Sequence, residues 1–149
     1  MEKYYYGYDE FLGDVKTLHH RIREYAPDTL LAIARGGLTL GHFLAIAMDT
    51  RRLFVLNSIH YDGTRKLDTL RISNIPDLSD AGKVLILDDI ADSGETLVAV
   101  LQRLRKLYPE LTFKVATLFY KPGSLVQPDF TVREATSWVD FFWEIDPLE

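Results

Sequence analysis

One segment, residues 84–97, constrains the fold and the chemistry of this chain more than any other. It starts with an apolar run (84–87), continues with the adjacent carboxylates of Asp88 and Asp89, and ends in a turn that opens a helix. A short, continuous apolar run bounded by a turn is typical of a strand buried on both faces. Backbone N–H groups at a helix N-terminus bind anions, and Gly94 allows a ligand to approach closely. The segment therefore predicts an anion-binding turn beside paired acids.

The remaining sequence repeats the alternation of apolar runs and helical periodicity. Asp9 is placed to cap the first helix, and residues 60–78 have the polar composition of a loop. Alternating strands and helices predict an α/β fold, a mostly parallel central sheet flanked by helices on both faces. Ligands bind such sheets beyond the carboxyl ends of the strands. We expect helices at about 9–25, 40–48 and 97–108, and strands at 30–34, 53–59, 84–87 and 114–120.

Length and charge narrow the class of protein. The 149 residues fit one domain, and the net charge of −5 is a poor match to a nucleic-acid binder, which usually has a basic face. The chain has no cysteines, which fits a reducing cytoplasm, and it shows no secretory leader or apolar run long enough for an integral membrane segment. We therefore expect a cytoplasmic enzyme or binding domain.

The residues of 88–96 suit a ligand that carries both hydroxyls and phosphate. Two carboxylates beside a phosphate-binding turn can bind diol hydroxyls and Mg²⁺, and the hydroxyls of Ser93 and Thr96 add phosphate donors. Neither the P-loop pattern nor the dinucleotide-binding glycine pattern is present. Taken alone, Asp88 and Asp89 would more simply form a solvated turn, but their place between a buried strand and an anion-binding turn weakens that interpretation.

The segment resembles the phosphoribosyl diphosphate signature of the type I phosphoribosyltransferases, in which two acids precede a D-[ST]-G-x-T turn. The resemblance implies that fold, with a small C-terminal hood and a mobile loop. It implies that Asp88 and Asp89 hold the ribose hydroxyls, directly or through Mg²⁺, as the metal-binding pair. The ribose and 5-phosphate site would comprise Asp88, Asp89, Ala91, Asp92, Ser93, Gly94, Glu95 and Thr96.

Asp92 points to the 6-oxopurine branch of that family. It stands where those enzymes carry a general base or acid for purine N7, and where adenine and orotate enzymes usually lack a carboxylate. A residue that opens the phosphate turn faces the sugar C1, so the required reach is plausible. The alternative is that Asp92 only caps the helix that follows it.

A second loop, Ala34-Arg35-Gly36-Gly37, resembles the family's diphosphate-binding loop. Exposed N–H groups and the Arg35 charge would stabilise a leaving diphosphate, and the resemblance predicts a cis peptide bond at Ala34–Arg35. Without the other motif, a plain Gly-Gly turn would be the better interpretation. The loop after residue 59 lies where relatives have a catalytic flap with a Ser-Tyr pair. That pair has no clean counterpart here; Arg65 and Lys66 are the candidates to reach the diphosphate.

The purine site is expected from the C-terminal half. By resemblance, Lys121 donates to purine O6, which selects a keto base because an ammonium group has no acceptor to offer. Trp138 would stack on the ring, and Val139 would contribute backbone groups. Glu144 stands at an acidic position near the metal and the diphosphate that is usually Asp in relatives. The expected purine-binding residues are Ile90, Lys121, Trp138, Val139 and Glu144, and the expected catalytic residues are Asp92, Lys121 and Arg35.

The resemblance is strongest to the bacterial xanthine–guanine enzymes. It implies a purine-salvage transferase that joins phosphoribosyl diphosphate to guanine, xanthine or hypoxanthine, with Mg²⁺ and as a homo-oligomer (dimer or tetramer). One domain (1–149) would contain a core at about 9–122, a flexible loop at about 60–78, and a hood at about 123–149 joined by N-terminal residues. Two alternatives stay open: a nucleic-acid-binding regulatory protein of the same fold, and an enzyme for adenine or a pyrimidine. The sequence does not rank the three oxopurines.

Overall fold

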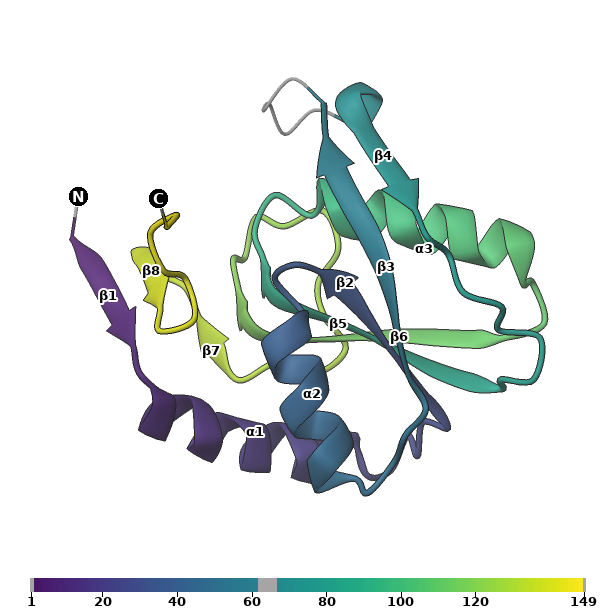
Figure 1. Cartoon of the computed structure of the whole chain (residues 1–149), viewed down its shortest axis with the longest axis horizontal. Coiled ribbons are helices and arrows are strands. Elements are labelled where there is room, and N and C mark those ends of the chain that lie inside the picture. Colours follow the sequence, from purple (N-terminus) through teal and green to yellow (C-terminus); the bar gives the residue numbers. More distant parts are fainter. Residues whose placement is uncertain (1, 62–66, 149) are drawn as a thin grey trace.

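The computed structural model describes residues 2–61 and 67–148. Its main feature is a six-stranded sheet in the order β4-β3-β2-β5-β6-β7. The neighbours from β3 through β7 run parallel, and β4 pairs antiparallel with β3. The parallel strands therefore end at one common edge of the sheet (Figure 1). The strands are β2 (Thr29–Ala34), β3 (Leu53–His60), β4 (Leu70–Ser73), β5 (Lys83–Ala91), β6 (Thr112–Tyr120) and β7 (Arg133–Glu134).

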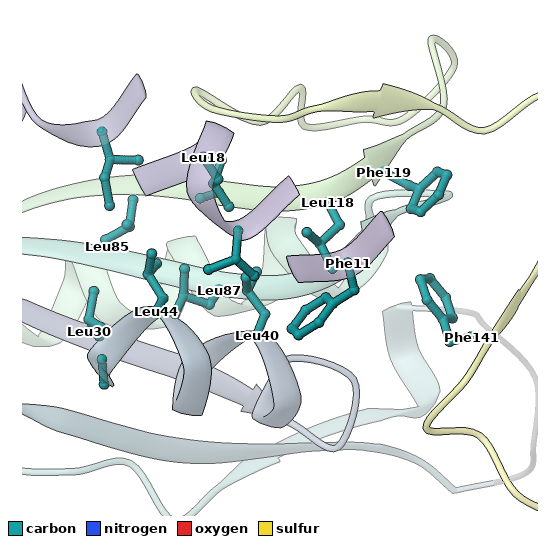
Figure 2. Close-up of a cluster of buried hydrophobic side chains, with 14 of the residues drawn as sticks. Phe11, Leu18, Leu30, Leu40, Leu44, Leu85, Leu87, Leu118, Phe119 and Phe141 are labelled. Carbon is teal, nitrogen blue, oxygen red and sulfur yellow. The ribbon is translucent and has the colours of Figure 1, made fainter. Parts of the chain in front are cut away.

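Three helices cover the two faces of this sheet: α1 (Tyr8–Ile22), α2 (Leu38–Ala47) and α3 (Glu95–Leu107). Side chains alternate along the buried strands, so Leu85 and Leu87 of β5 pack with α1 and α2, whereas Ile86 packs with α3. The apolar side chains on the α1 and α2 side of the sheet form one buried cluster. Figure 2 shows Leu40, Leu44 and other members of this cluster between α1, α2 and the sheet. None of the helices in the described part of the chain is long and apolar enough to cross a membrane.

The expected α/β architecture, with a mostly parallel sheet and helices on both faces, is confirmed. Three details differ from the sequence-based expectations. Asp9 does not cap α1, because the helix starts at Tyr8 and Gly7 is its N-cap residue. Strand β5 continues to Ala91, so the two acids lie within the strand instead of after it. The stretch expected to be loop also contains β4 and a 3₁₀ turn at Leu67–Thr69.

A second, two-stranded sheet joins the two ends of the chain. Strand β1 (Lys3–Tyr6) runs parallel to β8 (Trp138–Phe141), with Lys3 opposite Trp138 and Tyr6 opposite Phe141. Beyond β8, the Phe142 N–H donates to the Tyr6 carbonyl at 3.0 Å. The N-terminal strand therefore fixes the C-terminal segment beside the carboxyl edge of the main sheet (Figure 1).

A buried carboxylate ties this second sheet to α1 and β7. The Tyr6 hydroxyl donates to Asp14 Oδ2 at 2.6 Å, and Arg133 Nε donates to the same oxygen at 2.7 Å. Burial and the hydrogen bond to Asp14 raise the pKa of the Tyr6 hydroxyl, so Tyr6 stays a donor at ordinary pH. The Tyr6 ring packs edge-on against Phe119 and Phe141. The Tyr6 side chain thus contacts α1 through Asp14, the main sheet through Phe119, and β8 through Phe141.

We predict that Tyr6→Phe lowers the free energy of unfolding by about 2 kcal/mol, because the buried Asp14 carboxylate loses a charge-assisted hydrogen bond. Urea unfolding followed by circular dichroism measures this change. Tyr5→Phe is the matched control, since the Tyr5 side chain is 59% exposed, and we expect its effect to stay within about 0.5 kcal/mol. Equal effects of the two variants would contradict a structural role for the Tyr6 hydroxyl.

Candidate active site

A cleft of about 930 Å³ opens at the carboxyl edge of the main sheet. It lies between the loop after β2, the end of β5 with the turn that follows, and the C-terminal segment around β8. Segments far apart in the sequence therefore meet at the place where an open α/β sheet binds its ligands. The residues from the sequence analysis that line it are Ala34, Arg35, Gly36, Asp88, Asp89, Ile90, Ala91, Asp92, Ser93, Gly94, Thr96, Lys121, Trp138, Val139 and Glu144.

The paired acids face the backbone of the loop after β2. A Cβ added to Gly36 would lie 2.7 Å from Asp88 Oδ1 and 2.8 Å from Asp89 Oδ1, so a larger residue there would displace the two carboxylates. The Asp89 N–H donates to Asp88 Oδ1 at 2.9 Å, which orients the first carboxylate. The peptide bond between Ala34 and Arg35 is cis, as expected from the sequence. The loop and the carboxylates together form one wall of the cleft.

The turn after β5 forms the adjoining wall. Gly94 adopts φ +86° and precedes α3, whose first N–H groups point out of the helix as potential anion donors. Its Cα packs directly on the loop after β6: an added Cβ would lie 2.6 Å from the Leu125 nitrogen. The Leu125 N–H in turn donates to the Ser93 carbonyl at 2.9 Å. The position of the turn is therefore set by a neighbouring loop as well as by its own sequence.

Asp92 and Lys121 come together across the cleft from the ends of adjacent strands. The Lys121 ammonium group lies 2.9 Å from Asp92 Oδ1, and both side chains are partly exposed. The Lys121 N–H donates to the Ala91 carbonyl at 2.9 Å, which holds the start of the loop after β6 against the end of β5. A carboxylate and a cationic donor thus lie close enough together to contact one ligand.

The C-terminal segment supplies an aromatic face and a further carboxylate. Trp138 lines the cleft with 54% of its surface exposed, whereas Val139, the next residue, is buried. Glu144 also lines the cleft. Burial and the nearby charges of Asp89 and Asp140 raise the pKa of the Glu144 carboxyl, and Arg35 partly offsets them. Glu144 therefore contributes to a concentration of negative charge next to the paired acids.

The structure does not place every candidate residue in the cleft. Gly37 and Glu95 are not among the lining residues; Gly37 packs against β5, where an added Cβ would be 2.3 Å from the Leu87 carbonyl oxygen. Arg65 and Lys66 lie outside the described residues. Ser58, Thr39 and Trp143 also line the cleft, although no sequence motif indicated them. Alternating polar residues at the carboxyl end of β3 are the signal that could have indicated Ser58.

Known proteins are similar to this chain over most of its length. Residues 7–149 match the family model described as "Phosphoribosyl transferase domain". A xanthine-guanine phosphoribosyltransferase of Ruegeria sp. (strain TM1040) is 28% identical over 156 residues, covering 95% of this chain and 85% of that enzyme.

Two solved structures are also similar over nearly the whole chain. Helicobacter pylori xanthine-guanine-hypoxanthine phosphoribosyltransferase superposes with a TM-score of 0.90 and 37% identity, covering 97% of this chain and 95% of that one. A purine phosphoribosyltransferase from Pyrococcus horikoshii superposes with a TM-score of 0.83 and 32% identity, covering 100% and 98%.

Proposed function

Because this chain belongs to the phosphoribosyltransferase family, we propose that it transfers the 5-phosphoribosyl group of phosphoribosyl diphosphate to a 6-oxopurine, with Mg²⁺. The bond between C1 and the diphosphate oxygen breaks, a bond between C1 and purine N9 forms, and the proton on N7 leaves the base. The products are a nucleoside 5′-monophosphate, diphosphate and a proton. The observation that carries this proposal is the contact between Asp92 and Lys121 in a cleft that Trp138 also lines.

The base would lie against Trp138, with O6 toward Lys121 and N7 toward Asp92. The ammonium group and the carboxylate contact each other, so the two groups are close enough together to meet two neighbouring purine atoms. Lys121 offers only donors and therefore favours a keto oxygen over the amino group of adenine. Asp92 accepts the N7 proton as C1 is attacked. The indole face orients the planar ring, which is an entropic contribution to the rate.

The sugar phosphate would bind the turn at the start of α3, and the diphosphate would bind the loop after β2. N–H groups at the N-terminus of α3, together with Ser93 and Thr96, suit the 5-phosphate. Arg35 and the backbone of the 34–37 loop suit the departing diphosphate, where preorganised donors stabilise developing charge. Both anions would then flank the ribose hydroxyls held by the paired acids.

The donor set at the paired acids fits Mg²⁺. Within residues 2–61 and 67–148, no three His, Cys, Asp or Glu side chains are grouped to hold a metal ion by themselves. Mg²⁺ is commonly held by one or two carboxylates together with substrate phosphates, and Asp88 and Asp89 converge on the same glycine at the cleft wall. These two residues would hold the ion, which offsets the negative charge of the diphosphate when bound.

We also propose a homo-oligomer, a dimer or tetramer. Its support is apolar surface on α2 and at the N-terminus, including Ile46 at 70% and Tyr5 at 59% exposure.

The cytoplasmic location, the single domain and its division into core, loop and hood stay predictions. The pairing of β1 with β8 supports the inclusion of N-terminal residues in the hood.

The test of the proposed function is a panel of bases. We expect diphosphate release with phosphoribosyl diphosphate, Mg²⁺ and guanine, hypoxanthine or xanthine, and at least roughly a hundredfold lower kcat/KM with adenine or orotate, whose ring substituents leave Lys121 or Asp92 unpaired. Comparable turnover of adenine or orotate would show that the base site is misassigned. Binding of phosphoribosyl diphosphate without turnover of any base, together with salt-dependent binding of RNA or DNA, would favour the regulatory alternative.

A further inference from the structure

A second cavity, of about 380 Å³, lies at the edge of the main sheet where the parallel strands begin, opposite the edge that carries the cleft. Its lining comes from the C-terminal end of α1, the starts of β5 and β6, and the segment that pairs beside β6. The lining residues are Arg21, Glu24, Tyr25, Lys83, Lys114 and Phe130. A cavity of this size can hold a small ligand. It shares no lining residue with the cleft, so it is a separate candidate site.

Two aromatic rings in this lining are held in place by the backbone around them. The Tyr25 side chain is buried, and its hydroxyl lies 2.9 Å from the Val84 carbonyl oxygen and 3.1 Å from the Thr112 carbonyl oxygen. The Phe130 N–H donates to the Val115 carbonyl at 3.1 Å. The centroids of the Tyr25 and Phe130 rings are 6.1 Å apart. These contacts give the cavity a wall of fixed shape.

Three positively charged side chains gather at this wall. The Lys114 ammonium nitrogen lies 4.9 Å from the centroid of the Tyr25 ring, and the Lys83 nitrogen lies 6.0 Å from the same centroid. Arg21 Nη1 donates to the Thr131 carbonyl, which positions the guanidinium group. A guanidinium group has five N–H donors, so most of them stay available to a ligand. The cations come from α1, β5 and β6, so the fold itself brings them together.

None of these cations is paired with a carboxylate in the part of the chain that the structure describes, because no carboxylate oxygen lies within 4.0 Å of them. Two neighbouring carboxylates bind backbone N–H groups instead. Asp28 Oδ2 accepts from the Lys83 N–H at 2.8 Å, and Asp129 Oδ2 accepts from the Val115 N–H at 2.8 Å. Glu24 is the one acid in the lining, and it is exposed. The lining therefore keeps an excess of positive charge.

We propose that this cavity binds a polyphosphate group. Arginine binds phosphate oxygens through pairs of N–H donors, and lysine binds them as a point charge. Three cations around one cavity suit a ligand that carries several negative charges. Lys83 is the first residue of β5, and Lys114 lies near the start of β6. The site is thus separate from the cleft, and its existence does not depend on the proposed function.

Amine-reactive footprinting of the purified full-length chain, read by mass spectrometry, locates the bound anion directly. Inorganic triphosphate is the probe. At ten times its dissociation constant, acetylation of Lys83 and Lys114 should slow by roughly tenfold, because the bound fraction is protected. Lys106, on the exposed surface of α3, is the control and should react at an unchanged rate. No slowing at Lys83 and Lys114, or an equal slowing at Lys106, would overturn the proposal.

Variants of the two lysines measure what each contributes. Lys83→Gln is followed by the protection of Lys114, and Lys114→Gln by the protection of Lys83, so binding in the cleft does not interfere. Each variant should weaken triphosphate binding by roughly tenfold, the effect of losing a hydrogen bond to a charged group. Lys106→Gln should bind as the unmodified chain does. Unchanged affinity in both cavity variants would overturn the proposal.

A parallel titration with adenosine triphosphate distinguishes the two sources of a polyphosphate group. Equal affinity for the two probes would show recognition of the phosphates alone, and tighter binding of the nucleotide would show that its base also contacts the cavity. Thermal unfolding checks that each variant is folded, and the footprint of the unmodified chain decides if one is not. The protection of Lys121 reports the cleft separately. Failure of the base panel would therefore overturn the proposed function and leave this result readable.

Discussion

Asp92→Asn is expected to lower kcat by about 10²- to 10⁴-fold, the usual contribution of a positioned general base or acid. Asparagine keeps the size of the side chain, and its amide oxygen can still accept from the Lys121 ammonium group, which lies 2.9 Å from Asp92 Oδ1. What the variant loses is the ability to accept the N7 proton. The KM for phosphoribosyl diphosphate should therefore change little while kcat falls. Steady-state diphosphate release with guanine, measured over a range of both substrates, separates the two parameters.

Asp49→Asn is the matched control for this variant. Asp49 is exposed and has φ +51°, a conformation that asparagine adopts as readily as aspartate. Its kcat should equal that of the unmodified enzyme. The alternative that Asp92 only caps α3 is wrong, because Gly94 is the N-cap residue and no side chain caps that helix. A loss of less than tenfold in Asp92→Asn would therefore mean that the carboxylate only pairs with Lys121. The proton would then be taken up by another group or by water.

Gly94→Ala is expected to lower the free energy of unfolding by about 2–5 kcal/mol, through left-handed backbone strain and steric overlap. The residue has φ +86°, and an added Cβ would lie 2.6 Å from both the Leu125 nitrogen and Ser124 Oγ. Because the Leu125 nitrogen is backbone, the loop after β6 must shift to make room. That shift also moves the turn proposed to bind the 5-phosphate, so affinity for a nucleoside monophosphate should fall as well. Urea unfolding and a ligand titration measure the two effects.

Gly13→Ala is the control, and we expect it to raise the free energy of unfolding instead of lowering it. Gly13 lies within α1, and an added Cβ there meets nothing within 4 Å. Alanine in place of glycine in a helix should raise stability by about 0.5–1 kcal/mol. If both variants changed stability in the same direction and by a similar amount, backbone strain at Gly94 would not be the cause.

Much of the main sheet could be predicted because its signals are local. The apolar run at 84–87 and the acids that follow belong to one contiguous segment, and the structure places that segment at the centre of the sheet and the cleft. The loop at 34–37 is likewise one contiguous segment, but its cis peptide bond was expected only from the family resemblance. By contrast, β4 has only four residues and pairs at the sheet edge, so its alternation of apolar and polar residues is too short to indicate a strand within a polar stretch.

The pairing in the two-stranded sheet could not be predicted from the sequence, for a different reason. Strand β1 contains three consecutive tyrosines, and it pairs with β8, which lies more than 130 residues away. Nothing in either four-residue segment indicates its partner, because strand pairing depends on where the rest of the fold brings the two segments. The shared hydrogen bonds of Tyr6, Asp14 and Arg133 could not be foreseen for the same reason.

The sequence by itself determined the α/β class, the turn that is proposed to bind an anion, and the residue types available for the proposed chemistry, since each depends on neighbours within a few positions along the chain. Only the tertiary structure decided which groups meet. Parallel strands end at one edge, and this brings Lys121 to Asp92, the Gly36 backbone to the paired acids, and Ser58 to the same cleft. The physical reason is that hydrogen-bonded register and side-chain packing, which act between distant segments, set these distances, and a single sequence does not display them.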